Sequence, residues 1–391
     1  MPDKESKYSF IKAALDQRRE EDRFRALRSI ESFLDGPFIK IEDKKLINFC
    51  SNDYLGLASH PSIIERSKEY LEQFGAGSAS SRLISGTLKI HSDIEKKLAE
   101  VFEFESVLIF NSGFQANVSI ISAIADRNSL IILDKKCHNS LVQGSILSRA
   151  TIKRFHHNDS EHLESLLKSA NQSEFNRILI ITETIFSMDG DQNKLDDLIQ
   201  LSEKYDALLY SDDAHALGVL GENGLGLNYR KEGIDFRVGT FGKSFGGFGA
   251  FVGCSTEIRD YLINFSSGFI YTTALPPSVI GGLSAALDLI PFMQAERTAL
   301  FKLIDNFKLS LRALDFNLME SESQIIPIIV GSESETIMFS NFLQENGLWV
   351  SSIRPPTVEE GTSRLRITLT VKHEKDHVDA LISSLKEWKY D

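Results

Sequence analysis

Short apolar runs recur through the middle of the chain and alternate with segments of helical periodicity. The clearest runs lie at residues 107–110, 129–133, 177–182, 207–211, 236–239 and 250–254. Continuous apolar strands between helices are typical of a largely parallel sheet that helices cover on both faces. The sequence therefore predicts an α/β fold, in which ligands bind beyond the carboxyl ends of the strands.

The pattern differs at the two ends of the chain. Residues 8–34 have the spacing of one helix, and residues 284–314 have the spacing of another, longer one. Shorter strand and helix patterns follow each of them. We therefore expect three parts: an N-terminal helix and hairpin segment (1–50), a large ligand-binding domain (51–283) and a small C-terminal α+β domain (284–391).

Composition narrows the class of protein. The chain has 391 residues and a net charge of -12, which argues against nucleic-acid or anionic-membrane partners because both reward basic surfaces. Its three cysteines are widely spaced, so neither a disulfide framework nor a thiolate metal site is indicated. The first residues lack the apolar core of a signal peptide, and no apolar run approaches the ~20 residues of a membrane span. We expect a cytoplasmic enzyme.

One lysine, Lys243, lies within the glycine- and aromatic-rich stretch 240–247. An ammonium group in an apolar, tightly turned segment costs free energy unless it is paired or loses its proton. A lysine that loses its proton is a nucleophile for carbonyls, including that of pyridoxal phosphate. The alternative is an ordinary surface turn, and this stretch alone does not decide between them.

The run 207–211 ends in an acidic pair followed by a histidine. A carboxylate such as Asp212 at the end of a buried strand needs a cationic partner, and a pyridinium nitrogen is one. His215 could reach the phenolic oxygen of the same ring. Alternatively, Asp212 could simply cap a helix. Lys243, which lies 28 residues after His215, strengthens the first interpretation, in which both stretches serve one cofactor.

Polar residues follow the other predicted strands as well. The stretch 111–114 lies between a strand and a helix, where free N–H groups would bind a phosphate or would form a plain turn. His138 could lie flat on an aromatic cofactor or be an ordinary loop histidine. Ser187 could bond the cofactor, and Glu183 could sit behind Asp212.

Other chemistries lack their motifs. His156, His157 and His162 do not form an HExxH arrangement and no cysteine accompanies them, so we expect no metal site. The G-x-S-x-G elbow of serine hydrolases and the Walker A phosphate loop are also absent from the sequence.

Nearly the whole chain resembles the α-oxoamine synthases, pyridoxal-phosphate enzymes of the aspartate-aminotransferase fold type. The matching stretches are FCSNDYLGLASHP at 49–61, GSASSRLISGT at 77–87, FNSGFQAN at 110–117, DKKCHNSL at 134–141, ETIFSMDGD at 183–191, DDAHALGVLGENGLG at 212–226, TFGKSFG at 240–246, YTTALPP at 271–277 and IRPPTVEEGTSRLRITLT at 353–370. The resemblance implies a mostly parallel seven-stranded sheet between helices, and pyridoxal 5'-phosphate as cofactor.

The resemblance also implies residue roles. Lys243 would form the Schiff base and handle the α-proton of the substrate, Asp212 would pair the pyridine nitrogen, His215 would bond the phenolic oxygen, and His138 would stack on the ring. The residues that would surround the cofactor and its phosphate are Gly113, Phe114, Ser187, Thr240 and, from a neighbouring subunit, Thr273. The enzyme would then be a homodimer with active sites at the subunit interface.

Within that family, the C-terminal motif resembles the branch that joins L-alanine to a pimeloyl thioester in biotin biosynthesis. Asn52 would bind near the amino acid, while Arg354, Thr357 and Arg364 would be available for a substrate carboxylate. Arg25 matches an arginine at the mouth of the acyl site, although its surroundings also suit a solvated helix face.

Some points stay open. The acyl donor could be pimeloyl-CoA or pimeloyl-acyl carrier protein. The loop 77–87 and the aromatic turn after Lys243 depart from the family pattern, which affects the expected acyl preference. The rivals are another α-oxoamine synthase, such as glycine C-acetyltransferase, and a non-catalytic dimer partner. The presence of Lys243, Asp212, His215 and His138 argues against the second rival.

Overall fold

The computed structural model describes residues 7–170 and 174–390 and divides the chain into two compact units. The larger unit consists of Asn52–Ser187 and Asp191–Ala299. The smaller unit consists of Met188–Gly190 and the described residues of Met1–Ser51 and Leu300–Asp391. The division into three parts at residues 50 and 283 stays a prediction.

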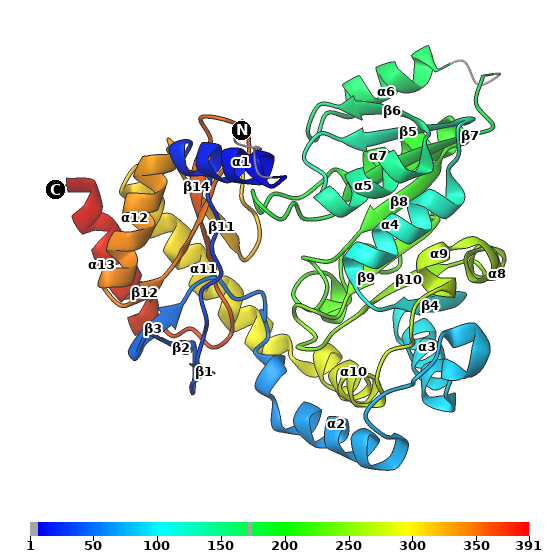
Figure 1. Ribbon diagram of the computed structural model, residues 1–391, viewed down its shortest axis with the longest axis horizontal. Coiled ribbons are helices and arrows are strands. Elements are labelled where there is room, and N and C mark those ends of the chain that lie inside the picture. The colour runs from blue at the N-terminus through cyan, green and yellow to red at the C-terminus, as the bar shows by residue number, and fades with distance from the viewer. Residues whose placement is uncertain (1–6, 171–173, 391) are drawn as a thin grey trace, which may run out of the picture. The chain divides into compact units, whose positions relative to one another are not determined.

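A seven-stranded sheet forms the centre of the larger unit, in the order β4-β10-β9-β8-β7-β5-β6 (Figure 1). Only β10 runs antiparallel to its neighbours. The predicted mostly parallel α/β fold is confirmed. The strands are β4 (Ser106–Phe110), β5 (Ser129–Asp134), β6 (Thr151–Phe155), β7 (Arg177–Glu183), β8 (Leu208–Asp212), β9 (Phe236–Thr240) and β10 (Ala250–Cys254).

Helices cover both faces of this sheet, which explains the continuous apolar runs. Ile131 and Leu133 of β5 pack in one core with α4 (Gly113–Ile124) and α5 (Asn139–Ser148). Leu130 and Ile132 of the same strand face the other way and pack in a second core with α6 (Ser160–Ser169) and α7 (Leu195–Lys204). Successive side chains of a strand alternate between its faces, so both sets must be apolar when both faces are buried.

The helices of the larger unit alternate with its strands through most of the sequence. They are α2 (Pro61–Phe74), α3 (Lys89–Phe102), α4 (Gly113–Ile124), α5 (Asn139–Ser148), α6 (Ser160–Ser169), α7 (Leu195–Lys204), α8 (Thr256–Phe265), α9 (Ser267–Ile270) and α10 (Pro277–Leu289). The prediction of one helix over 284–314 is wrong. Proline interrupts helical hydrogen bonding, and Pro291 lies in a short turn between α10 and α11 (Gln294–Ala313).

The smaller unit contains two small sheets. β1 (Ser32–Phe33), β2 (Phe38–Ile41), β3 (Lys44–Asn48) and β12 (Leu348–Trp349) form one, and β11 (Ile325–Gly331), β14 (Ser363–Thr368) and β13 (Ser351–Ile353) form the other. Its remaining helices are α1 (Ser9–Glu20), α12 (Glu333–Glu345) and α13 (Lys375–Tyr390).

The predicted helix over 8–34 is wrong beyond Glu20. Asp22 adopts a left-handed φ of 54°, which ends the helix. Arg23 then forms ion pairs with Glu333 at 2.9 Å and Glu360 at 3.0 Å, so contacts with distant residues of the same unit determine the path. Arg25 therefore lies outside any helix.

Among the described residues, no single helix has both the length and the apolar composition to cross a membrane. Within the described ranges, one bent pair of helices, Pro277–Phe292 with Gln294–Ala313, would meet this criterion by length and composition alone.

Close packing of α10 on α2 gives the first prediction. A Cβ on Gly281 would lie 2.5 Å from the backbone oxygen of Arg66, so Gly281→Ala must separate the two helices. We expect a loss of about 1–3 kcal/mol in the free energy of unfolding, measured by denaturant titration. Gly77→Ala is the matched control because nothing lies within 4 Å of its Cβ. Equal stability of the two variants would contradict this account of the packing.

Candidate active site

The carboxyl ends of neighbouring parallel strands bring three carboxylates and a threonine to one edge of the sheet. β5 ends at Asp134, β7 at Glu183, β8 at Asp212 and β9 at Thr240. Glu183 and Asp212 are register partners on adjacent strands. Burial, and then the charge of Asp212, raise the pKa of Glu183 well above its usual range. Adjacent buried carboxylates favour the binding of a cation at this edge.

Asp212 is buried, and two donors orient its carboxylate. Its Oδ1 accepts a hydrogen bond from the amide of Ala214 at 3.0 Å, and its Oδ2 accepts one from Nδ2 of Asn117 at 2.8 Å. The residues that follow form turns, so the alternative in which Asp212 caps a helix is wrong. A carboxylate held in this way suits a protonated pyridine nitrogen.

Asn117, on α4, connects Asp212 to the predicted stacking histidine. Its Nδ2 donates to Oγ of Ser140 at 2.9 Å as well as to Asp212, and its Oδ1 accepts from the hydroxyl of Tyr210 at 2.6 Å. Ser140 Oγ lies 2.7 Å from Nδ1 of His138. Asn117, Ser140 and Tyr210 were not predicted as site residues, although Asn117 and Ser140 lie in family-like stretches.

These contacts determine the proton position on His138. The backbone amide of Ser140 also donates to Nδ1, at 3.2 Å, so Nδ1 is an acceptor and the neutral ring carries its proton on Nε2. Burial lowers the pKa of His138; Asp212 opposes this effect and Lys243 adds to it. The backbone amide of His138 donates to the carboxylate of Glu183. The ring is therefore oriented as a neutral donor.

His215 is tied to the stretch 51–56. Its Nδ1 lies 2.7 Å from the hydroxyl of Tyr54, which also donates to Oδ1 of Asn52 at 3.2 Å. Both rings are buried. Asn52, predicted near the amino-acid substrate, and His215, predicted near the phenolic oxygen, thus share one partner. Tyr54 was not singled out from the sequence.

The loop between β9 and β10 has a defined shape. The amide of Phe241 donates to the carbonyl of Gly249 at 2.9 Å, and the buried rings of Phe241 and Phe245 lie 5.4 Å apart. Gly246 has a φ of 61°, and a Cβ there would lie 2.2 Å from the backbone nitrogen of Ala58. The aromatic residues anchor the loop, and this glycine permits the close approach.

Lys243 projects from this loop and is partly buried. Its charge lowers the pKa of both His138 and Glu183, which places the ammonium group within electrostatic range of the strand ends. The interpretation of an ordinary surface lysine is therefore disfavoured. The expected depression of its own pKa stays a prediction.

The start of α4 provides donors for an anion. Ser112 caps the helix by accepting a hydrogen bond from the amide of Gln115 at 3.2 Å. The first N–H groups of a helix have no acceptor within it, so the amides of Gly113 and Phe114 can bind a phosphate. A Cβ on Gly113 would lie 3.6 Å from Oγ1 of Thr240, so these two predicted residues are neighbours.

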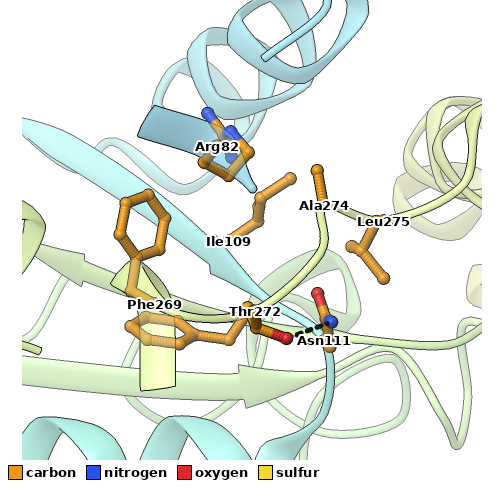
Figure 2. Close-up of a pocket in the computed structure, with 8 residues that line it drawn as sticks. Arg82, Ile109, Asn111, Phe269, Thr272, Ala274 and Leu275 are labelled. Atoms are coloured by element: carbon orange, nitrogen blue, oxygen red, sulfur yellow. Dashed lines mark hydrogen bonds between the residues drawn. The ribbon is translucent and has the colours of Figure 1, made fainter. Parts of the chain in front are cut away.

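Residues 272–273 lie beside this helix start in the same chain. Nδ2 of Asn111 donates to the carbonyl of Thr273 at 2.9 Å and to Oγ1 of Thr272 at 3.1 Å, the latter drawn in Figure 2. The close-up also shows Arg82 at the edge of a small pocket. The predicted approach of Thr273 to a phosphate in a neighbouring subunit stays a prediction.

Four predicted substrate-binding residues belong to the smaller unit: Arg25, Arg354, Thr357 and Arg364. Arg25 donates to Oγ1 of Thr357 at 2.9 Å. Arg354 donates to the backbone carbonyl of Asp22. The buried guanidinium of Arg364 pairs with Asp189, so it already has a carboxylate partner. Substrate binding by these residues stays a prediction.

Two groups of possible metal ligands occur among the described residues; one lies at the start of α6, and the other includes His157 and Asp191. His156, Asp159 and His162 offer atoms within 4.8 Å of one another. However, Asp159 caps α6, and Nδ1 of His162 accepts from the backbone amide of His156 at 2.9 Å. This hydrogen bond puts the proton of the neutral His162 ring on Nε2, which opposes metal binding there. Helix capping accounts for the cluster.

The larger unit thus has the donor set that pyridoxal phosphate requires. A buried carboxylate can face the ring nitrogen, an oriented imidazole can face the ring, a helix start can bind the phosphate, and a lysine can reach the aldehyde carbon. The parts come from strand ends and one helix start, as expected for ligand binding in an open α/β sheet.

Comparisons with known proteins agree with this cofactor. The model of the family "Aminotransferase class I and II" matches residues 44–385. The 8-amino-7-oxononanoate synthase of Geobacter sulfurreducens is 42% identical over 380 residues, 96% of each chain, and that of Geotalea daltonii is 42% identical over 376 residues, 95% of each chain.

The chain belongs to the 8-amino-7-oxononanoate synthase family. Solved relatives include the enzyme of Francisella tularensis, with 29% identity, a TM-score of 0.75 and coverage of 88% of this chain and 99% of that one. A serine palmitoyltransferase of S. paucimobilis, described with a bound PLP-myriocin aldimine, has 27% identity, a TM-score of 0.91 and 98% coverage of both chains. The predicted family, cofactor and acyltransferase class are confirmed.

The link between Ser140 and His138 gives a second prediction. In Ser140→Ala the imidazole loses one of its two Nδ1 donors, so we expect kcat to fall about five- to tenfold while the absorbance of the bound cofactor is retained. Ser145→Ala, which removes a hydroxyl bonded to a backbone carbonyl on the same helix, is the control. Equal kcat in both variants would show that the Ser140 hydroxyl does not orient His138.

Proposed function

We propose that this chain condenses L-alanine with a pimeloyl thioester to give 8-amino-7-oxononanoate, CO2 and the free thiol, a step of biotin biosynthesis. The observation that carries the proposal is the chain of hydrogen bonds from Asp212 through Asn117 and Ser140 to His138, in a protein whose relatives of similar length are named for this reaction. Pyridoxal phosphate, when bound, supplies the electron-withdrawing ring.

The residues at the strand ends have complementary tasks. Asp212 keeps a proton on the ring nitrogen, and Asn117 holds its carboxylate in place. Lys243 Nζ takes the proton from the α-carbon of alanine and returns one later in the cycle. His138 donates from Nε2 to an oxygen that gains negative charge during condensation and decarboxylation.

The arginines of the smaller unit suit the acyl substrate. A pimeloyl thioester ends in a free carboxylate, which an arginine fork can bind. Burial is the largest cause that lowers the pKa of Arg354, and the charge of Arg25 lowers it further. The two guanidinium groups are therefore within electrostatic range of each other. Two neighbouring guanidinium groups favour an anion. We assign the binding of this carboxylate to Arg25, Arg354 and Thr357. Arg364 could contribute only if its guanidinium group bound the substrate while it stayed paired with Asp189.

The same proposal covers assembly and location. We propose a cytoplasmic homodimer in which Thr273 of one subunit serves the site of the other. The identity of the acyl carrier, CoA or carrier protein, is part of the test. The nearer rival is glycine C-acetyltransferase, which uses a smaller amino acid and a short acyl group without the terminal carboxylate.

A substrate panel separates these reactions. Thiol release is measured with alanine, glycine or serine, each paired with pimeloyl-CoA, pimeloyl-acyl carrier protein or acetyl-CoA. We expect alanine with one of the pimeloyl donors to give the highest kcat/KM. If glycine with acetyl-CoA is the better pair, the biotin assignment is lost although the cofactor chemistry stands.

Replacement of the lysine tests the catalytic role. In Lys243→Ala we expect loss of the visible absorbance of a lysine Schiff base and a fall of about a hundredfold or more in kcat, because the amine that moves the proton is gone. Lys136→Ala, which changes a lysine on a neighbouring turn, is the control. Full activity of Lys243→Ala, or wild-type protein that binds no cofactor, would contradict a catalytic role and favour a non-catalytic partner.

A further inference from the structure

One partly buried histidine outside the residues assigned above connects two of the turns that carry them. His157 lies in the turn between β6 and α6, and its side chain is 16% exposed. Its Nδ1 is 2.9 Å from Oδ1 of Asp134, and its Nε2 is 2.6 Å from Oδ2 of Asp191. Each ring nitrogen therefore faces a carboxylate oxygen.

This geometry requires a charged ring. A carboxylate only accepts hydrogen bonds, so both ring nitrogens of His157 must carry protons. Burial lowers the pKa of His157, but its hydrogen bonds to Asp134 and Asp191 outweigh that effect and raise it to about 9. One imidazolium thus lies between two buried carboxylates. Without this cation the two negative charges would be left uncompensated, which is strongly unfavourable.

The first carboxylate shapes the turn before His138. Asp134 is the last residue of β5, and its Oδ1 also accepts from the amide of Lys136 at 2.8 Å. Its backbone carbonyl accepts from the amide of Cys137 at 3.2 Å. The hydrogen bonds of Asp134 therefore define the path of the chain from the strand end to His138.

Asp191, which bears the second carboxylate, closes the turn that carries Ser187 through its backbone. The backbone carbonyl of Asp191 accepts from the amide of Phe186 at 3.0 Å. The ring of Phe186 contacts the ring of His157 edge to face, with centroids 4.4 Å apart. Asn158 supports the same arrangement, because its amide group donates to Oδ2 of Asp191 at 3.0 Å. His157 thus contacts both Asp191, which closes this turn, and Phe186, which precedes Ser187.

We propose that His157 is a positioning residue for the cofactor, a partly buried cation that holds the turn presenting His138 and the turn presenting Ser187 in the arrangement that binds pyridoxal phosphate. It acts through Asp134 and Asp191 and not on the reacting atoms. The inference rests on the proposed function only in taking His138 and Ser187 as cofactor contacts.

The test compares two neighbouring histidines. His157→Gln removes a cation whose side chain is 16% exposed, while His156→Gln makes the same change on a side chain that is 72% exposed. Apoprotein of each is titrated with pyridoxal phosphate, and the dissociation constant, the visible circular dichroism of the bound cofactor and the thermal midpoint of the apoprotein are measured. We expect the dissociation constant of His157→Gln to rise about tenfold or more, with an altered dichroism, and His156→Gln to match wild type.

A purely structural role would give a different result. If His157→Gln lowers only the thermal midpoint and binds the cofactor with wild-type affinity and dichroism, the proposal is overturned. If that variant does not fold, Asp191→Asn decides, because it keeps the side-chain shape and removes one charge; weaker binding supports the proposal and wild-type binding overturns it. No amino-acid or acyl substrate is used, so failure of the alanine–pimeloyl reaction would leave this result unaffected.

Discussion

The charge of buried carboxylates at one edge of the sheet is the constraint on which the site depends. Glu183 and Asp212 end adjacent strands, and Asp134 ends a third. Carboxylates at such positions are stable only when donors or cations face them. Asp134 is paired with His157. Asp212 accepts hydrogen bonds from the side-chain amide of Asn117 and the backbone amide of Ala214. Burial raises the pKa of Glu183. A pyridinium nitrogen bound at Asp212 would complete this charge balance.

The sequence predicted the elements whose cause is local. The strands of the large sheet are buried on both faces, so their apolar runs are visible without knowledge of their neighbours. The helix predicted over 8–34 failed because a contact remote in sequence, from Arg23 to Glu333, redirects the chain after Glu20. The helix over 284–314 failed for a reason present in the sequence, because Pro291 interrupts an otherwise helical pattern.

The same distinction applies to the site. Asp212, His138 and Lys243 were predicted because a charged or titratable residue after an apolar strand is conspicuous. Asn117, Ser140 and Tyr54 were not, because an amide or hydroxyl has no special meaning until its partner is known. The sequence raised only a metal-ligand role for His157. Its contact with Asp191 could not be predicted, because the two residues are 34 positions apart in the sequence.

The central claim is that Asp212, oriented by Asn117, keeps the ring nitrogen of the cofactor protonated. The most direct measurement is the nitrogen-15 NMR shift of pyridoxal phosphate labelled at its ring nitrogen and bound to the protein. We predict the shift of a protonated pyridinium in wild type, and a change toward the neutral value in Asp212→Asn. A neutral pyridine shift in the wild-type holoenzyme would contradict the account.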